Sequence, residues 1–488
     1  MAAAPWAGVP SNEQFFVLLT GANSGVGQGI CQRLIDEFLA TRPLSAHLVL
    51  IPTTRSPQKS RETIESLRAY LANAAQTSTK LRSRAGPDFD PDAAVSRVHL
   101  LAVEVDLCKL PSVYDAAAKL VGGRARDPTG FVAGGQDVTI PKLDAVLFNA
   151  GYGGWDGIKW FEAARQVFTV GLVQATTFPS FKSAQAGHIL PPQEASGSKS
   201  GEEDGSSSKN SSQPVLAEVF CANTFGHYVL AHELMPLLTR TDPSEPAARV
   251  VFTSSIDAEE RHLDLDDFQG FKSTAAYESS KRVTDIMCLT SELPSVQAVS
   301  SSYFSSGTAS SSSRKYTKKP RLYLSHPGIV CTPLFPLNAF LFFFYYYAML
   351  LSRLLGSPWH GVDPYVGACA TVWLALEDEA TLDASGAQRV KWGSAADRHG
   401  RADPKKTEVE GWGWEGKTED AEALKRDEAS GILRKLKGRK WDAVQLTDEK
   451  RQKFEEDGVR CWKEMENLRM QWEGIMGRRP GPEKNGKA

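Results

Sequence analysis

Short apolar runs alternate with amphipathic stretches through the first 150 positions. The apolar runs lie at 17–20, 47–54, 98–105 and 143–148, and another follows at 321–325. After the first run, Ile30, Leu34 and Phe38 recur at intervals of four, which is the spacing of one helix face. Alternating strands and helices predict an α/β fold: a doubly wound, Rossmann-type parallel sheet with helices on both faces.

The first apolar run ends in a glycine-rich turn with the spacing Thr-Gly-x-x-x-Gly-x-Gly. Gly21 allows a tight turn, and Gly25 and Gly27 let the backbone approach a pyrophosphate at the positive end of the next helix. A strand before the turn and a helix after it are the context that such a loop requires. The candidates for cofactor contact in it are Thr20, Gly21, Ser24, Gly25, Val26 and Gly27.

A tyrosine and a lysine four positions apart, Tyr277 and Lys281, are the candidate acid and its supporting cation. On a helix they share one face, so both can point into one cleft. A nearby cation can lower a tyrosine pKa from near 10 by roughly 1–3 units, towards the range that general acid catalysis needs. Tyr-x-x-x-Lys also occurs by chance in many helices, so the pair depends on the rest of the chain for its interpretation.

The ends of the later apolar runs supply further candidates for cofactor contact. Thr54 and Arg55 follow the second run, where dinucleotide folds often place an acid for the ribose 2′-hydroxyl. A cation suits a 2′-phosphate, which favours NADPH over NADH; the alternative is that Arg55 only solvates a loop. Asp106 could contact the adenine ring, and the fourth run ends in a segment that would lie near the cofactor ribose. That segment is Asn149, Ala150 and Gly151.

Taken in order, these residues resemble the pattern of the short-chain dehydrogenase/reductase family over residues 12–378. The residues that carry the resemblance are Thr20, Gly21, Gly25, Gly27, Asp106, Asn149, Ala150, Gly151, Asn223, Ser254, Ser255, Tyr277 and Lys281. Within that family, the stretches 266–270 and 277–285 are similar to the 3-ketosteroid reductases of sterol C-4 demethylation and to the related 17-beta-hydroxysteroid dehydrogenase type 7.

The resemblance implies a role for each catalytic residue. Tyr277 would give its proton to a substrate carbonyl, and Lys281 would lower the pKa of that tyrosine and bind the nicotinamide ribose. Ser255 would hydrogen-bond the developing alkoxide. Ser254 is the alternative, because strand alternation sends the two serines to opposite faces. Asn223 would support a proton-relay water, although it could also kink or cap a helix interior.

Two segments around the expected site are distinctive. The 22 positions from Ser255 to Tyr277 exceed those of the simplest family members, and the acid-rich stretch 257–274 is expected to form a loop over the active site. The run 326–332 resembles the loop that closes over the nicotinamide, with Val330 and Thr332 as its expected contacts.

The strongest signal outside the catalytic motifs is a run of 18 residues without charge at 334–351. As a helix it would reach about 27 Å, just short of a hydrocarbon core of roughly 30 Å. Its Pro336, Asn338 and three tyrosines favour an interfacial helix on a membrane surface over a span. The alternative is a core helix or a substrate lid.

Composition limits the remaining possibilities. A net charge of −2 argues against nucleic acid as a partner, and the seven cysteines include no Cys-x-x-Cys, so no metal site is indicated. Low-complexity sequence at 187–214 and 300–319 predicts disordered loops. We expect one domain over 12–378 and a charged extension over 379–488, whose tryptophans, Trp412 and Trp414 among them, either dock back, bind a partner or belong to a solvated tail.

Together these features predict NADPH-dependent reduction of a 3-keto sterol to the 3β-alcohol in ergosterol synthesis. The resemblance implies the cytosolic face of the endoplasmic reticulum membrane and lipid droplets as the location, with other enzymes of sterol C-4 demethylation as partners. Two alternatives stay open: another lipid-carbonyl reductase, such as one for retinal, and a membrane scaffold for sterol-synthesis enzymes.

Overall fold

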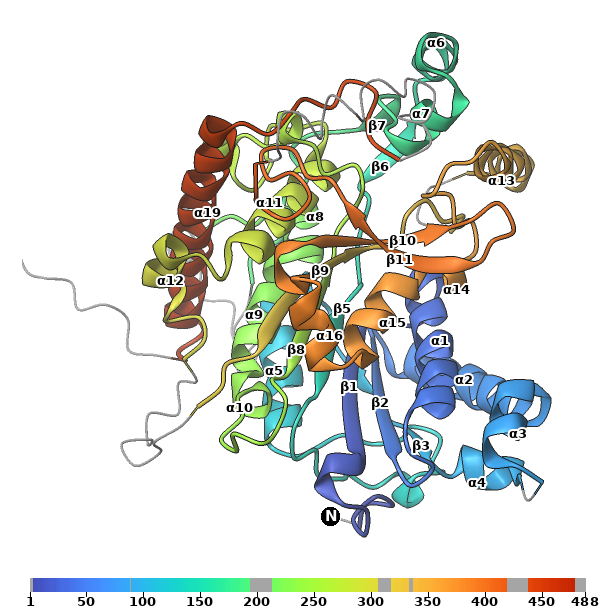
Figure 1. The fold of residues 1–488 in the computed structure, drawn as a ribbon. Helices are drawn as coiled ribbons and strands as arrows, with labels where there is room; N and C mark the ends of the chain where they lie inside the picture. Colours follow the sequence, from blue (N-terminus) through green and yellow to red (C-terminus); the bar gives the residue numbers. More distant parts are fainter. Residues whose placement is uncertain are drawn as a thin grey trace, which may run out of the picture.

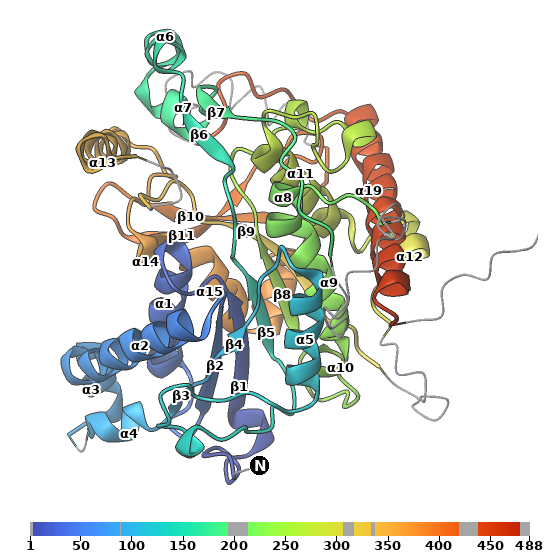
Figure 2. The same cartoon turned by 180° about the vertical axis from the view of Figure 1, so that it is seen from behind.

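A sheet of nine strands with helices on both faces forms the centre of the protein (Figures 1 and 2). The computed structural model describes residues 3–87, 89–193, 213–305, 317–332, 337–418 and 438–478. The strand order is β11-β10-β9-β8-β5-β1-β2-β3, with β4 also beside β2. The strands are β1 (Gln14–Thr20), β2 (His47–Thr54), β3 (Val98–Leu100), β4 (Val103–Glu104), β5 (Ala145–Phe148), β8 (Arg249–Thr253), β9 (Arg321–His326), β10 (Lys391–Ala396) and β11 (Ala402–Thr407).

The direction in which strands are added reverses between β1 and β5. From β1 the chain builds outward to β2 and β3, whereas β5, β8, β9 and β10 extend the sheet the other way. All of these neighbours are parallel, and only the β10–β11 pair is antiparallel among the described strands of this sheet. The predicted doubly wound sheet is therefore confirmed. Loops after β1 and β5 meet at the reversal, where open α/β sheets bind their ligands.

Helices bury the apolar sides of the sheet in two separate clusters. On one face lie α1 (Gly25–Thr41), which buries Ile30, Leu34 and Phe38, together with α2 (Pro57–Thr77) and α15 (Cys369–Leu376). On the other lie α5 (Leu110–Val121), α9 (Gly226–Glu233) and α11 (Ala276–Thr290). Shorter helices are α3 (Thr79–Ala85), α4 (Pro91–Val95), α8 (Glu218–Phe220), α10 (Met235–Leu238), α14 (Pro364–Gly367) and α16 (Glu379–Ala384).

The boundary predicted after residue 378 is wrong, because the later residues belong to the same sheet and core. Strand β10 pairs with β9, and the long helix α19 (Asp448–Ile475) packs along α11 and α12 (Pro294–Ser300), as the dark red helix in Figure 1 shows. Trp412 is buried in the cluster that contains α9 and α11, and Trp414 is half-buried. The docking alternative for the tryptophans is therefore the one observed.

A buried ion cluster fixes α19 to the domain. Arg469 donates to Glu466 Oε1 over 2.7 Å and pairs with Glu473, and its Nη1 lies 2.9 Å from Nε2 of His232. Tyr228 on α9 donates to Glu466 over 2.6 Å. Each of these side chains is at least 95% buried, so a polar network crosses the contact between helices that lie far apart in sequence.

The two low-complexity segments are ordered at their ends, contrary to the prediction of disordered loops. Tyr303 is fully buried and stacks on Tyr228 with ring centroids 4.2 Å apart. Gln193 Oε1 accepts from Leu110 N over 3.0 Å. Buried apolar and capping contacts therefore hold these ends, whereas 194–212 and 306–316 lie outside the described residues.

A small subdomain follows β5 and stands apart from the main sheet (Figure 1, upper right). It consists of β6 (Trp155–Ile158), α6 (Trp160–Val170), α7 (Leu172–Thr177) and β7 (Lys182–Ala184), with β6 and β7 paired antiparallel. Helix α13 (Ala339–Leu354) packs against α7. It covers much of the apolar run, although 334–336 lie outside the described residues. Among the described residues, no helix has both the length and the apolar character to cross a membrane.

Candidate active site

The glycine-rich loop between β1 and α1 leaves room only for glycine at two positions. Gly21 has φ +70°, and a methyl group there would lie 2.7 Å from Ala150 Cα. A methyl group at Gly27 would lie 1.9 Å from Gly21 O. Ser24 precedes α1 with an extended backbone, and the helix begins at Gly25. The first turn of α1 thus opens towards the loop, as an anion-binding helix end requires.

Thr20 at the end of β1 and Asn149 directly after β5 join the glycine-rich loop to the loop that follows β5. Thr20 Oγ1 accepts hydrogen bonds from Asn149 N over 3.0 Å and Ala150 N over 3.1 Å. Asn149 Nδ2 donates to Gly21 O over 3.3 Å. Thr20 and Asn149 therefore shape the crevice through hydrogen bonds within the protein. The sequence analysis had assigned both residues to direct contact with the cofactor.

A cavity of about 510 Å³ runs from the glycine loop to Tyr277 and Lys281. The predicted residues that line it are Thr20, Gly21, Ser24, Gly25, Val26, Gly27, Thr54, Arg55, Asp106, Asn149, Ala150, Gly151, Tyr277, Lys281 and Thr332. Val330 is not among its lining residues. It packs on Gly367 instead, where an added methyl group would lie 2.5 Å from Val330 Cγ2. The expectation of a cofactor contact by Val330 is therefore not met in this structure.

Asn223 and Lys281 are both buried beside the cavity and bonded to the backbone. Asn223 lies in a π-helical segment, Cys221–Phe225, and its Oδ1 accepts from Tyr152 N over 2.7 Å. Lys281 Nζ donates to Thr253 O over 2.7 Å and lies 5.6 Å from the centroid of the Tyr277 ring. Burial lowers the pKa of Lys281 to about 8, with Asp285 opposing this shift and Lys391 adding to it. The structure thus brings the predicted asparagine, lysine and tyrosine together.

The two serines follow the end of β8, and their side chains interact with different residues of α11. The side chain of Ser255 hydrogen-bonds Tyr277. Ser254 is buried, and its Oγ donates to Asp285 Oδ1 over 2.5 Å. Ser255 is therefore the serine that interacts with the tyrosine, whereas Ser254, which lines the cavity, is bonded to the buried carboxylate of Asp285.

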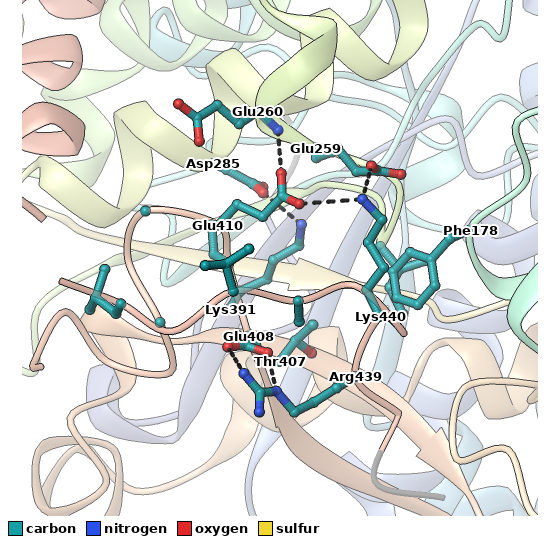
Figure 3. Close-up of a pocket in the computed structure, with 18 of the residues that line it drawn as sticks. Phe178, Glu259, Glu260, Asp285, Lys391, Thr407, Glu408, Glu410, Arg439 and Lys440 are labelled. Carbon is teal, nitrogen blue, oxygen red and sulfur yellow. Dashed lines mark hydrogen bonds and ion pairs between the residues drawn. The ribbon is translucent and has the colours of Figure 1, made fainter. Parts of the chain in front are cut away.

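The two serines are supported by a buried ion pair between Lys391 and Asp285, which the sequence analysis missed. Lys391 Nζ on β10 donates to Asp285 Oδ2 and to Ser255 O, each over 2.6 Å. Figure 3 shows the pair at the base of a second cavity of about 420 Å³. Lys391 lies 106 positions from Asp285 and beyond the expected end of the domain, so no local pattern could connect them.

The second cavity separates the domain from the segment that precedes α19. Its walls carry ion pairs: Arg439 Nη2 donates to Glu408 Oε1 over 2.6 Å, and Lys440 Nζ lies 2.5 Å from Glu259 Oε2 and 3.4 Å from Glu410 Oε1 (Figure 3). These contacts hold the segment before α19 across the cavity from the Lys391–Asp285 ion pair.

The pKa of Tyr277 shifts in the opposite direction to the sequence-based prediction. Burial raises the pKa of Tyr277 to about 12, and Lys182, rather than Lys281, opposes this shift most strongly. Glu278 and Asp257 add to the rise, and the hydrogen bond with Ser255 lowers it. The prediction failed because it weighed the nearby cation but not the removal of water from the phenol.

Lys182 on β7 is a second lysine at the tyrosine, and no sequence motif pointed to it. Its Nζ lies 4.7 Å from the ring centroid of Trp155 and 5.7 Å from that of Tyr277. It forms ion pairs with Asp257 and Glu278. Asp257 opens the acid-rich stretch that was expected to cover the active site, and its carboxylate does reach the tyrosine's surroundings.

The chain is similar over nearly its whole length to 3-keto-steroid reductases. No protein-family profile matches it. The 3-keto-steroid reductase of Gibberella zeae is 50% identical over 477 residues, which cover 98% of each chain. That of Aspergillus fumigatus is 41% identical over 473 residues and 94% of each chain. That of Schizosaccharomyces pombe is 29% identical over 403 residues, 81% of this chain and 90% of the relative. The glycine-rich loop, parallel sheet and Tyr-x-x-x-Lys pair of the chain are those of a short-chain dehydrogenase/reductase. Within that group, the chain belongs to the 3-keto-steroid reductase family.

Proposed function

We propose that the protein reduces the 3-keto group of a sterol intermediate to the 3β-alcohol with NADPH, in the C-4 demethylation branch of ergosterol synthesis. One observation carries the proposal: Tyr277, hydrogen-bonded to Ser255, stands with Lys281 at one end of a cavity that begins at the glycine-rich loop. The full-length similarity to relatives named as 3-keto-steroid reductases supports this substrate class.

The residues around the cavity fit a nicotinamide dinucleotide. The glycine loop has no room for a side chain at Gly27, and the start of α1 offers unpaired N–H groups to a pyrophosphate. Arg55, exposed just after β2, lines the cavity where a 2′-phosphate would need a cation, which favours NADPH. When bound, the cofactor supplies the hydride for the carbonyl carbon.

Tyr277 and Ser255 act on the carbonyl oxygen. Tyr277 donates its hydroxyl proton to that oxygen, while Ser255 hydrogen-bonds it as negative charge develops. Lys281, fixed to Thr253 O, holds a positive charge beside the tyrosine at neutral pH and faces the cofactor ribose. Asn223 fixes the Tyr152 backbone next to Gly151 and supports a proton-relay water.

We also propose that α13 and α6 contact a membrane surface, from which the sterol enters. Five aromatic residues are exposed on α13 and three on α6. They are Phe340, Phe343, Phe344, Tyr346 and Tyr347 on α13, and Trp160, Phe161 and Phe168 on α6. Exposed aromatic helix faces suit the interface of a bilayer. The proposed site is the cytosolic face of the endoplasmic reticulum and lipid droplets, where other enzymes of sterol C-4 demethylation would be within reach.

Flotation with phosphatidylcholine vesicles tests the membrane proposal. Phe340→Ser/Phe344→Ser is expected to lower the bound fraction several-fold, because it removes two exposed rings from α13. Phe131→Ser removes an equally exposed ring on another part of the surface and is the matched control. Equal binding by all three proteins would contradict the proposal.

Oxidation of NADPH in the presence of a 4-methyl-3-ketosterol tests the reaction, with retinal as the comparison substrate. Tyr277→Phe keeps the ring and removes the proton, so sterol turnover is expected to vanish in that variant. Turnover of retinal alone would indicate another lipid-carbonyl reductase. Cofactor binding without turnover of either substrate would indicate a scaffold.

A further inference from the structure

Contacts with several elements hold Lys182 beside Tyr277. It comes from β7 in the subdomain after β5, about 95 positions before Tyr277, and its side chain is 13% exposed. Its ammonium lies over the indole of Trp155, and that indole in turn packs on the Tyr277 ring with centroids 4.6 Å apart. The subdomain therefore places a cation and an aromatic ring against the face of the phenol.

Two carboxylates fix the ammonium in this position. Asp257 and Glu278 form ion pairs with Lys182 from two different segments, the loop after β8 and the first turn of α11. Their side chains are only 8% and 5% exposed. A lysine whose charge served only solubility would not be enclosed between two buried acids, since burying charges is costly.

In the part of the chain that the structure describes, two lysine ammonium groups lie at similar distances from the Tyr277 ring. Lys281 lies at a similar distance, 5.6 Å against 5.7 Å from the Tyr277 ring centroid, but its ammonium is bonded to Thr253 O. Burial is the largest influence on the pKa of Tyr277, and Lys182 is the group that lowers that pKa most. Lys182 is thus a second cation at the tyrosine, in addition to the lysine of the Tyr-x-x-x-Lys motif.

We propose that Lys182 is a positioning residue for the reduction: a cation, held by Asp257 and Glu278, that stabilises the phenolate left on Tyr277 after its proton has moved to the substrate oxygen. The proposal rests on the proposed function of Tyr277 as the acid. In the step concerned, the Tyr277 O–H bond breaks, a new O–H bond forms on the substrate, and the electron pair stays on the phenolate oxygen. The substrate carbon receives the hydride of NADPH.

The test compares single-turnover reduction of the 3-ketosterol by wild type and Lys182→Met at pH 7, where Lys281 remains charged. Loss of the cation makes Tyr277 a weaker acid. We expect the single-turnover rate to fall about tenfold for each unit by which the tyrosine pKa rises, and the solvent deuterium isotope effect to increase because proton transfer limits the rate more. The KM for sterol is expected to stay within twofold. Lys182→Arg keeps the charge and is expected to restore both the rate and the isotope effect.

Two further variants separate this role from a structural one. Lys142→Met removes another lysine held by two carboxylates, Asp144 and Glu245, before β5, and is expected to change neither quantity. Lys182→Gln also removes the charge but keeps a hydrogen-bond donor for Asp257 and Glu278, so it supplies the same comparison if Lys182→Met unfolds. A slower Lys182→Met with an unchanged isotope effect, or a raised KM alone, would overturn the proposal. A wild type that does not reduce the sterol would instead refute the proposed function.

Discussion

Replacement of Lys391 by methionine should destabilise the protein and disturb catalysis together. Lys391 and Asp285 are 3% and 0% exposed, and their charged atoms are 2.6 Å apart. Without Lys391, Asp285 keeps the hydrogen bond from Ser254 and the more distant charge of Lys281, so a buried carboxylate loses its directly paired cation. Breaking a buried pair in this way costs about 3–5 kcal/mol. Ser255 O also loses its hydrogen bond, and a misplaced Ser255 would lower kcat by about 10- to 100-fold.

Urea unfolding and sterol reduction measured on the same preparations check this prediction. Arg401→Ala breaks the ion pair with Asp397 on the turn that joins β10 to β11, where the side chains are 81% and 37% exposed, and should cost less than about 1 kcal/mol. Lys391→Met/Asp285→Asn removes both charges and should recover part of the lost stability. The reasoning would be refuted by a Lys391→Met variant as stable and as active as Arg401→Ala.

Three more perturbations follow from the structure. Gly27→Ala should raise the Kd for NADPH at least about tenfold, since the methyl group would meet Gly21 O at 1.9 Å, whereas Gly8→Ala, in open space, should bind normally in fluorescence titrations. Lys281 has a folded pKa of about 8 against an ordinary 10.5, so the unfolded state binds more protons between these values and stability rises with pH there. Buried cysteines, whose pKa values are raised in the folded state, lower stability towards pH 10 in any variant, so the comparison is between proteins. From pH 7.5 to 10, urea unfolding should show wild type gaining up to about 3 kcal/mol relative to Lys281→Met; equal changes in both would contradict it. Arg469→Met leaves two carboxylates buried without their cation and should cost about 3–5 kcal/mol by the same measurement, with an unchanged midpoint counting against the buried network.

The parts of the site that the sequence predicted are those set by local geometry. A close approach between backbone segments requires glycine at one position, which can be recognised in the sequence, as at Gly27. Tyr277 and Lys281 are found together because helical spacing alone brings them together. The parallel sheet was predictable for the same reason, since β1 and β2 are short apolar runs that are each followed by a helix.

What the sequence could not supply depends on contacts between distant segments. Strand alternation separates Ser254 from Ser255 but does not say which faces Tyr277; Asp285, by engaging Ser254, distinguishes them. The pKa of Tyr277 was predicted with the wrong sign because the Trp155 ring, which covers the phenol from a different element, has no counterpart in the local motif.

The C-terminal residues are inseparable from the chemistry, which is why a domain boundary at 378 failed. Strand β10 is an inner strand with β9 on one side and β11 on the other, so removing it would expose an edge of the parallel sheet. It also carries Lys391, which supports both serines through Asp285 and Ser255 O. Helix α19 then covers α11, the helix that bears Tyr277 and Lys281. The charged composition of residues 379–488 suggested an appendage, yet two of its cations are buried in ion pairs. Lys391 pairs with Asp285 on α11, and Arg469 pairs with Glu466 and Glu473 on α19. The C-terminal residues thus hold α11, the helix of Tyr277, through both the Lys391 ion pair and the packing of α19.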